Sequence, residues 1–256
     1  MKTTQIFNIF AFVGVITVNA LANALPIGGF NTGELSDMYP NLFVPAGLTF
    51  SVWGVIYLLL FGYLVSQSLS LFNGKPTPDF VERIGGLFLV NCLANMAWIL
   101  VWHYQMPFIA LGVMLVILAS LISIYQKLEI GRREVSRREL WTAHIPFSVY
   151  LGWISIATIA NFTTVLVDMG WQGGPIGEEI WTIIMMIVGG ALGLFVLTTR
   201  KDVAFGLVLA WAIAGIYIKR SMTEPIYSNI VTAALVITGL LLLYSIFTLI
   251  NNLRKP

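Results

Sequence analysis

The stretch Pro45–Tyr63, PAGLTFSVWGVIYLLLFGY, decides the fold class of this chain. It carries no charged residue and, as a helix, is long enough to cross the roughly 30 Å hydrocarbon core of a bilayer. Pro45 is predicted to begin the helix, because a proline in the first turn sacrifices no backbone hydrogen bond. Helical spacing places four residues on one face: Phe50, Trp53, Tyr57 and Leu64. The stretch therefore predicts a transmembrane helix with an aromatic face.

Similar apolar runs of about 20 residues recur along the chain, which is 58% hydrophobic and only 10% charged. This composition excludes an ordinary soluble domain and predicts an all-α, polytopic membrane helix bundle of about eight transmembrane helices. The single cysteine, Cys92, excludes an intrachain disulfide and a cysteine-based metal site. The expected helices are 6–25, 45–69, 84–102, 107–125, 141–167, 180–198, 203–218 and 226–250.

The first apolar run also fits a secretory signal, because Lys2 precedes it and the small residues Ala20-Leu21-Ala22 stand near its end. We expect a retained first helix, with cleavage left open. The segment 26–43 that follows is expected to be an irregular loop rich in Gly, Asn and Pro.

The cations are distributed unequally between the two ends of the predicted bundle. Eight spans place both termini on one side, and that side collects most of the Lys and Arg residues: Lys2, Lys75, Arg83, Lys127, Arg132, Arg133, Arg137, Arg138, Arg200, Lys201, Arg254 and Lys255. Only Lys219 and Arg220 fall on the other side, where we expect their side chains to snorkel to the interface. The positive-inside rule therefore predicts cytoplasmic termini in a plasma or inner membrane.

Several function classes lack the residues that they need. No Asp, Glu, Lys or Arg lies in the middle of an expected helix, which argues against proton pumps, ion-coupled carriers and voltage sensors. His103 and His144 fall at opposite ends of the bundle and cannot share a metal. With no nucleophile set or phosphate loop in the membrane core, we expect no catalytic residue, no metal site and no required cofactor. An enzyme is thus the less favoured class.

Polar but uncharged residues line two further expected helices. Each face follows helical spacing: Asn91, Asn95, Trp98 and Trp102 in 84–102, and Tyr150, Trp153, Ala157, Asn161 and Thr164 in 141–167. One interpretation is that the Asn side chains bond neighbouring helices to one another. The other is a pocket with aromatic walls and a few hydrogen-bonding groups, suited to a flat apolar ligand. Spacing alone does not decide between them.

These residues resemble the translocator protein / tryptophan-rich sensory protein (TspO/MBR) family, whose members are five-helix membrane proteins. The family pattern in helix 2, roughly Pro-Pro-Gly-Trp-x-Phe and then Trp-x-x-x-Tyr, is matched by Pro45, Gly47, Phe50, Trp53 and Tyr57. The helix 3 and helix 5 patterns are matched by Asn95, Trp98, Tyr150, Trp153, Ala157 and Asn161. The resemblance covers about residues 6–167. It implies a five-helix TspO-like bundle over 1–170, followed by a three-helix extension over 171–256.

The family resemblance implies binding or sensing of a flat hydrophobic ligand, such as a porphyrin, another tetrapyrrole or a sterol-like lipid. A transporter of such a ligand is the alternative, and a light-dependent porphyrin-degrading enzyme is a further one. The expected ligand-binding residues are Trp53, Tyr57, Asn91, Asn95, Trp98, Tyr150, Trp153 and Asn161. The expected partners are membrane lipid and the small ligand, with no nucleic acid and with a homodimer left open. In the last helices, Gly189-x-x-x-Gly193 and Gly206-x-x-x-Ala210 predict close helix contacts, within the chain rather than between copies.

Overall fold

The computed structural model describes residues 2–24, 29–72 and 76–254, and these residues form helices and connecting segments without a strand. The eight long helices are α1 (Lys2–Ala24), α3 (Val52–Phe72), α5 (Leu87–His103), α6 (Pro107–Lys127), α8 (Ile145–Asp168), α9 (Gly177–Arg200), α10 (Val203–Met222) and α11 (Ser228–Leu253). By length and composition, seven helical segments of the described chain can cross a membrane. The eighth, α5, is a shorter apolar helix of 17 residues, at the lower limit for a span. The predicted polytopic helical bundle is confirmed.

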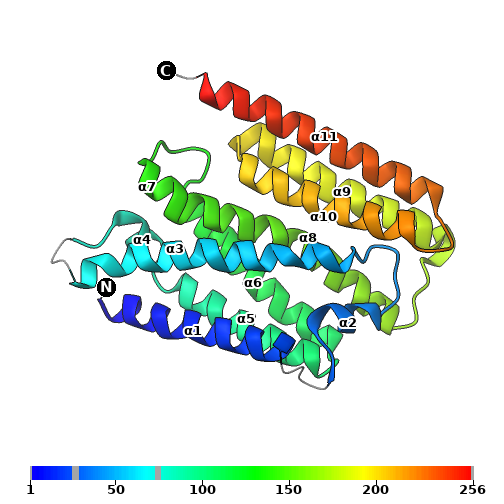
Figure 1. Cartoon of the computed structure of the whole chain (residues 1–256), viewed down its shortest axis with the longest axis horizontal. Helices are drawn as coiled ribbons and strands as arrows, with labels where there is room; N and C mark the ends of the chain where they lie inside the picture. The colour runs from blue at the N-terminus through cyan, green and yellow to red at the C-terminus, as the bar shows by residue number, and fades with distance from the viewer. Residues whose placement is uncertain (1, 25–28, 73–75, 255–256) are drawn as a thin grey trace.

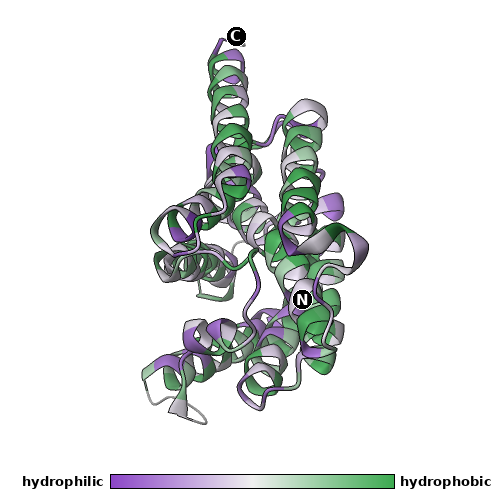
Figure 2. Cartoon of the chain, turned by 90° about the vertical axis from the view of Figure 1, so that its right-hand side faces the viewer, coloured by the Kyte–Doolittle hydropathy of each residue, from purple (hydrophilic) through white to green (hydrophobic). Residues whose placement is uncertain are grey.

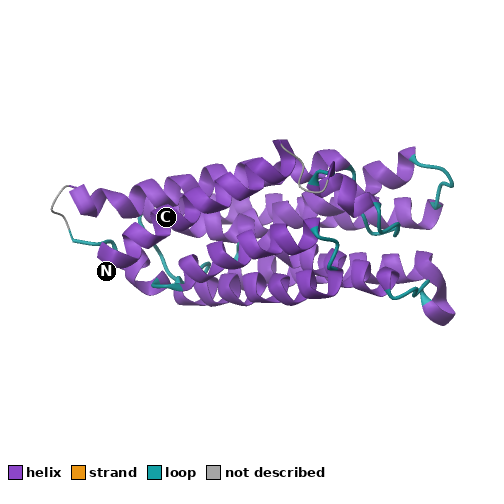
Figure 3. Ribbon diagram, turned by 90° about the horizontal axis from the view of Figure 1, so that it is seen from below, coloured by secondary structure: helices purple, strands orange, loops and turns teal. Residues whose placement is uncertain are grey.

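The helices run side by side (Figure 1, Figure 3). Helix α8 lies at the centre of the bundle (Figure 1). It packs against α3, α6, α9 and α10, and 15 of its 24 residues are buried. Both chain termini lie toward one end of the bundle, here called the terminal end, while the short helix α2 (Thr32–Asp37) lies at the opposite α2 end (Figure 1). Hydrophobic residues cover much of the long helices, and hydrophilic residues are frequent in the connections (Figure 2).

The expectation that the second span begins at Pro45 is wrong. The helix begins as a 3-10 segment, η2 (Gly47–Ser51), and continues into α3. Ala46 stays extended because its backbone N–H donates to the Gly215 carbonyl of α10, at 2.9 Å. The Trp211 indole N–H, also from α10, donates to the Thr49 carbonyl at 3.0 Å. These hydrogen bonds to a helix far away in the sequence outweigh the local preference of proline for a first turn.

The segment 26–43 was expected to be irregular, but it contains α2. The Asn31 side chain accepts hydrogen bonds from the Gly33 and Glu34 backbone N–H groups, both at 3.0 Å, and the Glu34 carboxylate accepts from the Asn31 N–H at 2.8 Å. This capping box was a readable signal, Asn followed three residues later by Glu, that the sequence interpretation missed. The Trp102 indole N–H of α5 donates to the Thr32 carbonyl and ties α2 to the bundle. Residues 25–28, shared by the expected first helix and loop, lie outside the described residues.

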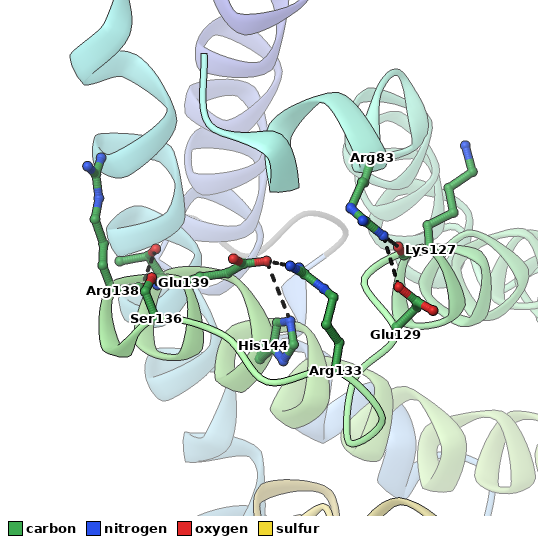
Figure 4. Close-up of polar contacts among 9 residues, drawn as sticks. Arg83, Lys127, Glu129, Arg133, Ser136, Arg138, Glu139 and His144 are labelled. Atoms are coloured by element: carbon green, nitrogen blue, oxygen red, sulfur yellow. Dashed lines mark hydrogen bonds and ion pairs between the residues drawn. The ribbon is translucent and has the colours of Figure 1, made fainter. Parts of the chain in front are cut away.

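The basic segment 127–138, at the terminal end, is held by contacts to several elements (Figure 4). Arg83 lies in the short helix α4 (Asp79–Ile84). Its guanidinium donates to the Lys127 carbonyl at 3.3 Å and to the Glu129 carboxylate at 3.1 Å. Arg133 pairs with Glu139, which belongs to the short helix α7 (Arg137–Glu139). A π-helical turn, η3 (Leu140–His144), then leads into α8. Lys75 and Lys255, two of the cations assigned to this end, lie outside the described residues. The cytoplasmic orientation of the end stays a prediction.

At the α2 end, Lys219 forms an ion pair with Asp37 of α2 at 2.5 Å instead of merely snorkelling. The neighbouring Arg220 is 8% exposed. Both side chains line a cavity of about 270 Å³ together with Asp37 and Glu178. Glu178 lies in the first turn of α9, directly after the 3-10 turn η4 (Gly174–Ile176). Lys219 and Arg220, the two cations at this end, therefore lie against other parts of the bundle.

Candidate ligand-binding site

An aromatic cluster joins α3 to α8 near the α2 end of the bundle. The Trp53 ring stacks on Tyr57, with centroids 5.4 Å apart. It meets Tyr150 and Trp153 of α8 edge-on, with centroids 5.8 and 6.3 Å away. Phe50, in η2, meets Trp153 edge-on at 5.9 Å. Such stacked and edge-to-face pairs place these rings in one rigid group. The predicted Trp53/Tyr57 face of α3 thus meets the predicted Tyr150/Trp153 face of α8.

Asn95 links three helices by its carboxamide. Its Nδ2 donates to the Tyr150 hydroxyl of α8 at 2.9 Å, and its Oδ1 accepts from Asn19 Nδ2 of α1 at 3.0 Å. Asn19 was not among the predicted site residues, although an Asn in an apolar helix must find a partner and so carries a signal. The Asn95 side chain is buried, and both ends of its amide are used within the protein.

Trp98 and Asn161 form a second link, between α5 and α8. The Trp98 indole N–H donates to Asn161 Oδ1 at 3.1 Å, and Asn161 Nδ2 donates to the Ala157 carbonyl at 3.0 Å. The Trp98 ring also stacks on Trp102, with centroids 5.6 Å apart. The hydrogen bond fixes the indole plane, so the ring presents a defined apolar surface.

Asn91 lies apart from the other predicted site residues. Its Nδ2 donates to Ser120 Oγ at 2.9 Å and to the Ile117 carbonyl at 3.4 Å, both in α6. Its contacts therefore join α5 to α6 and do not reach the aromatic cluster.

Two cavities adjoin the cluster. The larger cavity, of about 570 Å³, is lined by Ile16, Asn19, Ala20, Asn23, Asn31, Thr32, Gly33, Glu34, Asp37, Gly47, Phe50, Trp53, Tyr57 and Ile99. The smaller cavity, of about 50 Å³, is lined by Thr32, Ser36, Phe43, Val44, Pro45, Phe50, Trp53, Trp98, Trp102, Met114, Trp153, Ile156, Ala157, Ala160, Asn161, Thr164, Ala212 and Ile216. Small-molecule sites typically occupy roughly 300–1,000 Å³, so the larger cavity has the size of a ligand pocket.

The eight predicted site residues divide between these cavities and the surrounding framework. Trp53 and Tyr57 line the larger cavity, and Trp53, Trp98, Trp153 and Asn161 line the smaller one. Asn91, Asn95 and Tyr150 line neither of the two. Most of the polar lining of the larger cavity comes from α1 and α2, which the sequence interpretation did not connect with the site.

Two buried polar atoms of the cluster have no hydrogen-bond partner within the described part of the chain: Trp153 Nε1 and Tyr57 Oη. Trp153 is almost fully buried and lines the smaller cavity. Buried indole and phenol groups usually find a partner, so these atoms are available to a ligand that brings an acceptor. Among the described residues, no group of three or more His, Cys, Asp or Glu side chains is placed to hold a metal ion.

The fold and the cavities define a polytopic helical membrane protein with an aromatic-walled pocket near one end of the bundle. The family model of the TSPO-like proteins matches residues 5–247, and the chain belongs to that family. The match extends through α9 and α10 into α11. No curated protein and no solved structure matches the chain.

Proposed function

We propose that this protein binds a flat hydrophobic molecule, of the tetrapyrrole or sterol-like type, in the two cavities beside the aromatic cluster. The observation that carries the proposal is the position of Trp53, whose ring lines both cavities and is braced by Tyr57, Tyr150 and Trp153. A ring held on several sides offers a preorganised stacking surface, which loses little entropy when a planar ligand binds.

The lining suits a ligand that is apolar on its faces and polar at its edge. Phe50, Trp53 and Tyr57 supply the wall of the larger cavity, and the carboxamides of Asn19, Asn23 and Asn31 lie around it. A few convergent polar groups on a mainly apolar surface are typical of small-molecule sites, where they orient the ligand. The free indole N–H of Trp153 adds a donor at the smaller cavity.

The proposal is tested by Trp53→Leu, measured as equilibrium affinity for a tetrapyrrole in detergent. We expect a loss of about tenfold, because central aromatic residues contribute more than 1 kcal/mol at binding sites. Trp141→Leu is the matched control: the same residue change at a side chain that is 62% exposed and remote from both cavities. Equal affinities for both variants and the natural protein, with folding intact, would contradict the proposed site.

Transport and degradation use the same cavity and require further measurements. Flux of the bound tetrapyrrole across proteoliposomes would indicate a transporter, whereas saturable binding without flux would indicate a receptor or sensor. Illumination of the complex, followed by product analysis, tests the light-dependent enzyme.

A further inference from the structure

The two ends of the bundle carry opposite charge. The α2 end holds six acidic residues and two basic ones: Glu34, Asp37, Asp168, Glu178, Glu179 and Glu224 against Lys219 and Arg220. The other acidic residues lie toward the terminal end, together with the remaining Lys and Arg among the described residues. A ligand that enters the larger cavity from the α2 end therefore meets a negative potential, which repels anions and concentrates cations.

The charged residues that line the larger cavity are also negative. They are Glu34 and Asp37, and no Lys, Arg or His belongs to the described lining. The stretch 25–28, outside the described residues, contains no basic residue in the sequence either. Lys219, which lines the neighbouring cavity, forms an ion pair with Asp37 and so neutralises its charge. Glu34 accepts the Asn31 N–H and has no cationic partner in the described part of the chain.

On the basis of the proposed function, we propose that the larger cavity selects flat ligands by charge: it takes neutral or cationic rings and disfavours rings that carry carboxylates. A carboxylate placed at this rim would lose hydration without gaining a cationic partner and would face Glu34. A cationic group would instead be attracted by Glu34, and it would also interact favourably with the faces of Trp53 and Tyr57.

Three derivatives of one porphyrin test this charge preference: the dipropionic acid, its dimethyl ester and its bis(aminoethyl) amide. Their affinities are measured with the full-length protein in detergent. We expect the ester and the diamine to bind about tenfold more tightly than the diacid, because like charges brought together at a site are strongly unfavourable. The ester also partitions better into micelles, so the decisive quantity is how a variant changes the ratio of ester to diacid affinity.

Glu34→Gln is the decisive variant, because glutamine keeps the capping-box hydrogen bond while it removes the charge. We expect diacid affinity to rise about threefold to tenfold, ester affinity to stay constant and diamine affinity to fall. Glu224→Gln is the matched control: the same change at the same end, at a residue that lines none of the three cavities described above. It should change the ratio much less, and melting temperatures establish that both variants fold.

The outcomes separate the two proposals. A ratio of ester to diacid affinity that Glu34→Gln leaves unchanged, or changes no more than Glu224→Gln does, overturns the charge preference while the proposed function stands. If none of the three porphyrins binds the natural protein, the tetrapyrrole form of the proposed function fails and the charge preference fails with it.

Discussion

The aromatic region around Trp53 and the glycine-rich region of α9, α10 and α11 pack by opposite means. In the C-terminal helices, a Cβ added to Gly193 would lie 2.7 Å from Leu241 Cδ2, and one added to Gly206 would lie 2.7 Å from Leu197 Cδ1. In α3, by contrast, a Cβ added to Gly54 or Gly62 would meet no atom within 4 Å. Small residues let helix backbones approach closely, whereas bulky rings hold them apart.

This difference explains where the cavities lie. The contacts of Gly193 and Gly206 are within the chain, between α9, α10 and α11, as the small-residue spacing predicted. Neither cavity is lined by α9 or α11. The smaller cavity lies among aromatic side chains of α3, α5 and α8, and the larger one lies between α1, α2, η2 and the start of α3. We infer that α9 and α11 support the bundle, whereas the aromatic region, together with α10, forms the binding surface. The predicted division at residue 170 stays a prediction.

The largest effect is expected from removing α9, α10 and α11 by truncation after Glu178. The expected division into a five-helix TspO-like bundle over 1–170 and a three-helix extension over 171–256 predicts that the truncated bundle still binds ligand. The structure changes that expectation, because Ala212 and Ile216 of α10 line the smaller cavity and Gly215 anchors the Ala46 N–H. We now expect tetrapyrrole affinity in detergent to fall well beyond tenfold, a larger loss than a single residue change causes. Truncation after Tyr227 is the control, since it removes only α11, which lines neither cavity. A folded chain ending at Glu178 with full affinity would contradict this expectation.

The next effect concerns the close-packed region alone. Gly193→Val should destabilise the bundle by about 1–3 kcal/mol, because the new side chain must displace Leu241 and Leu209. Gly62→Val makes the same change in α3, where space is open, and should change stability much less. Thermal unfolding of both variants in detergent measures the difference. Equal melting temperatures of the two variants would contradict the proposal that α9 is more closely packed at Gly193 than α3 is at Gly62.

A comparable loss is expected at the border of the aromatic region. Asn95→Leu leaves the Tyr150 hydroxyl without its donor and removes one of the two hydrogen bonds donated by Asn19 Nδ2, which keeps its bond to the Val15 carbonyl. The change should cost about 1–3 kcal/mol of stability. Because Asn95 lines neither cavity, tetrapyrrole affinity should remain nearly unchanged. Reduced affinity at an unchanged melting temperature would instead identify Asn95 as a ligand anchor. Asn91→Leu, which removes the bond to Ser120, is the control for loss of a helix link remote from the cluster.

The smallest effect is expected at Asp202, the N-cap of α10. Its carboxylate accepts hydrogen bonds from Tyr125 of α6 at 2.9 Å and from Ser148 of α8 at 2.7 Å. Burial raises the pKa of Asp202 above its ordinary value, despite these hydrogen bonds, which lower it. The unfolded chain therefore loses this proton at a lower pH than the folded chain does. Stability should decline as pH rises from about 4, the ordinary pKa of Asp, toward the raised pKa. Asp202→Asn should remove this decline in melting temperature as pH rises above about 4, and an unchanged profile would contradict it.

Much of the architecture was predictable from local patterns. Apolar length indicates a membrane span, and a period of 3.6 residues assigns side chains to faces, so the eight helices and the Trp53, Trp98 and Trp153 faces were predictable. Asn31 and Glu34 of the capping box carried an equally local signal, although it was missed. The unequal distribution of Lys and Arg along the chain belongs to the same kind of information.

By itself, the sequence determined a polytopic helical bundle, the composition of each helix face and the charge of each end, because these depend on residues close together in the chain. Only the tertiary structure decided which faces meet. Asn91 and Asn95 share one face of α5, yet Asn91 bonds α6 while Asn95 bonds α1 and α8. Similarly, α10 holds Ala46 in an extended conformation across more than 160 residues of sequence. Such pairings depend on how whole helices pack around α8, and no local spacing contains that information.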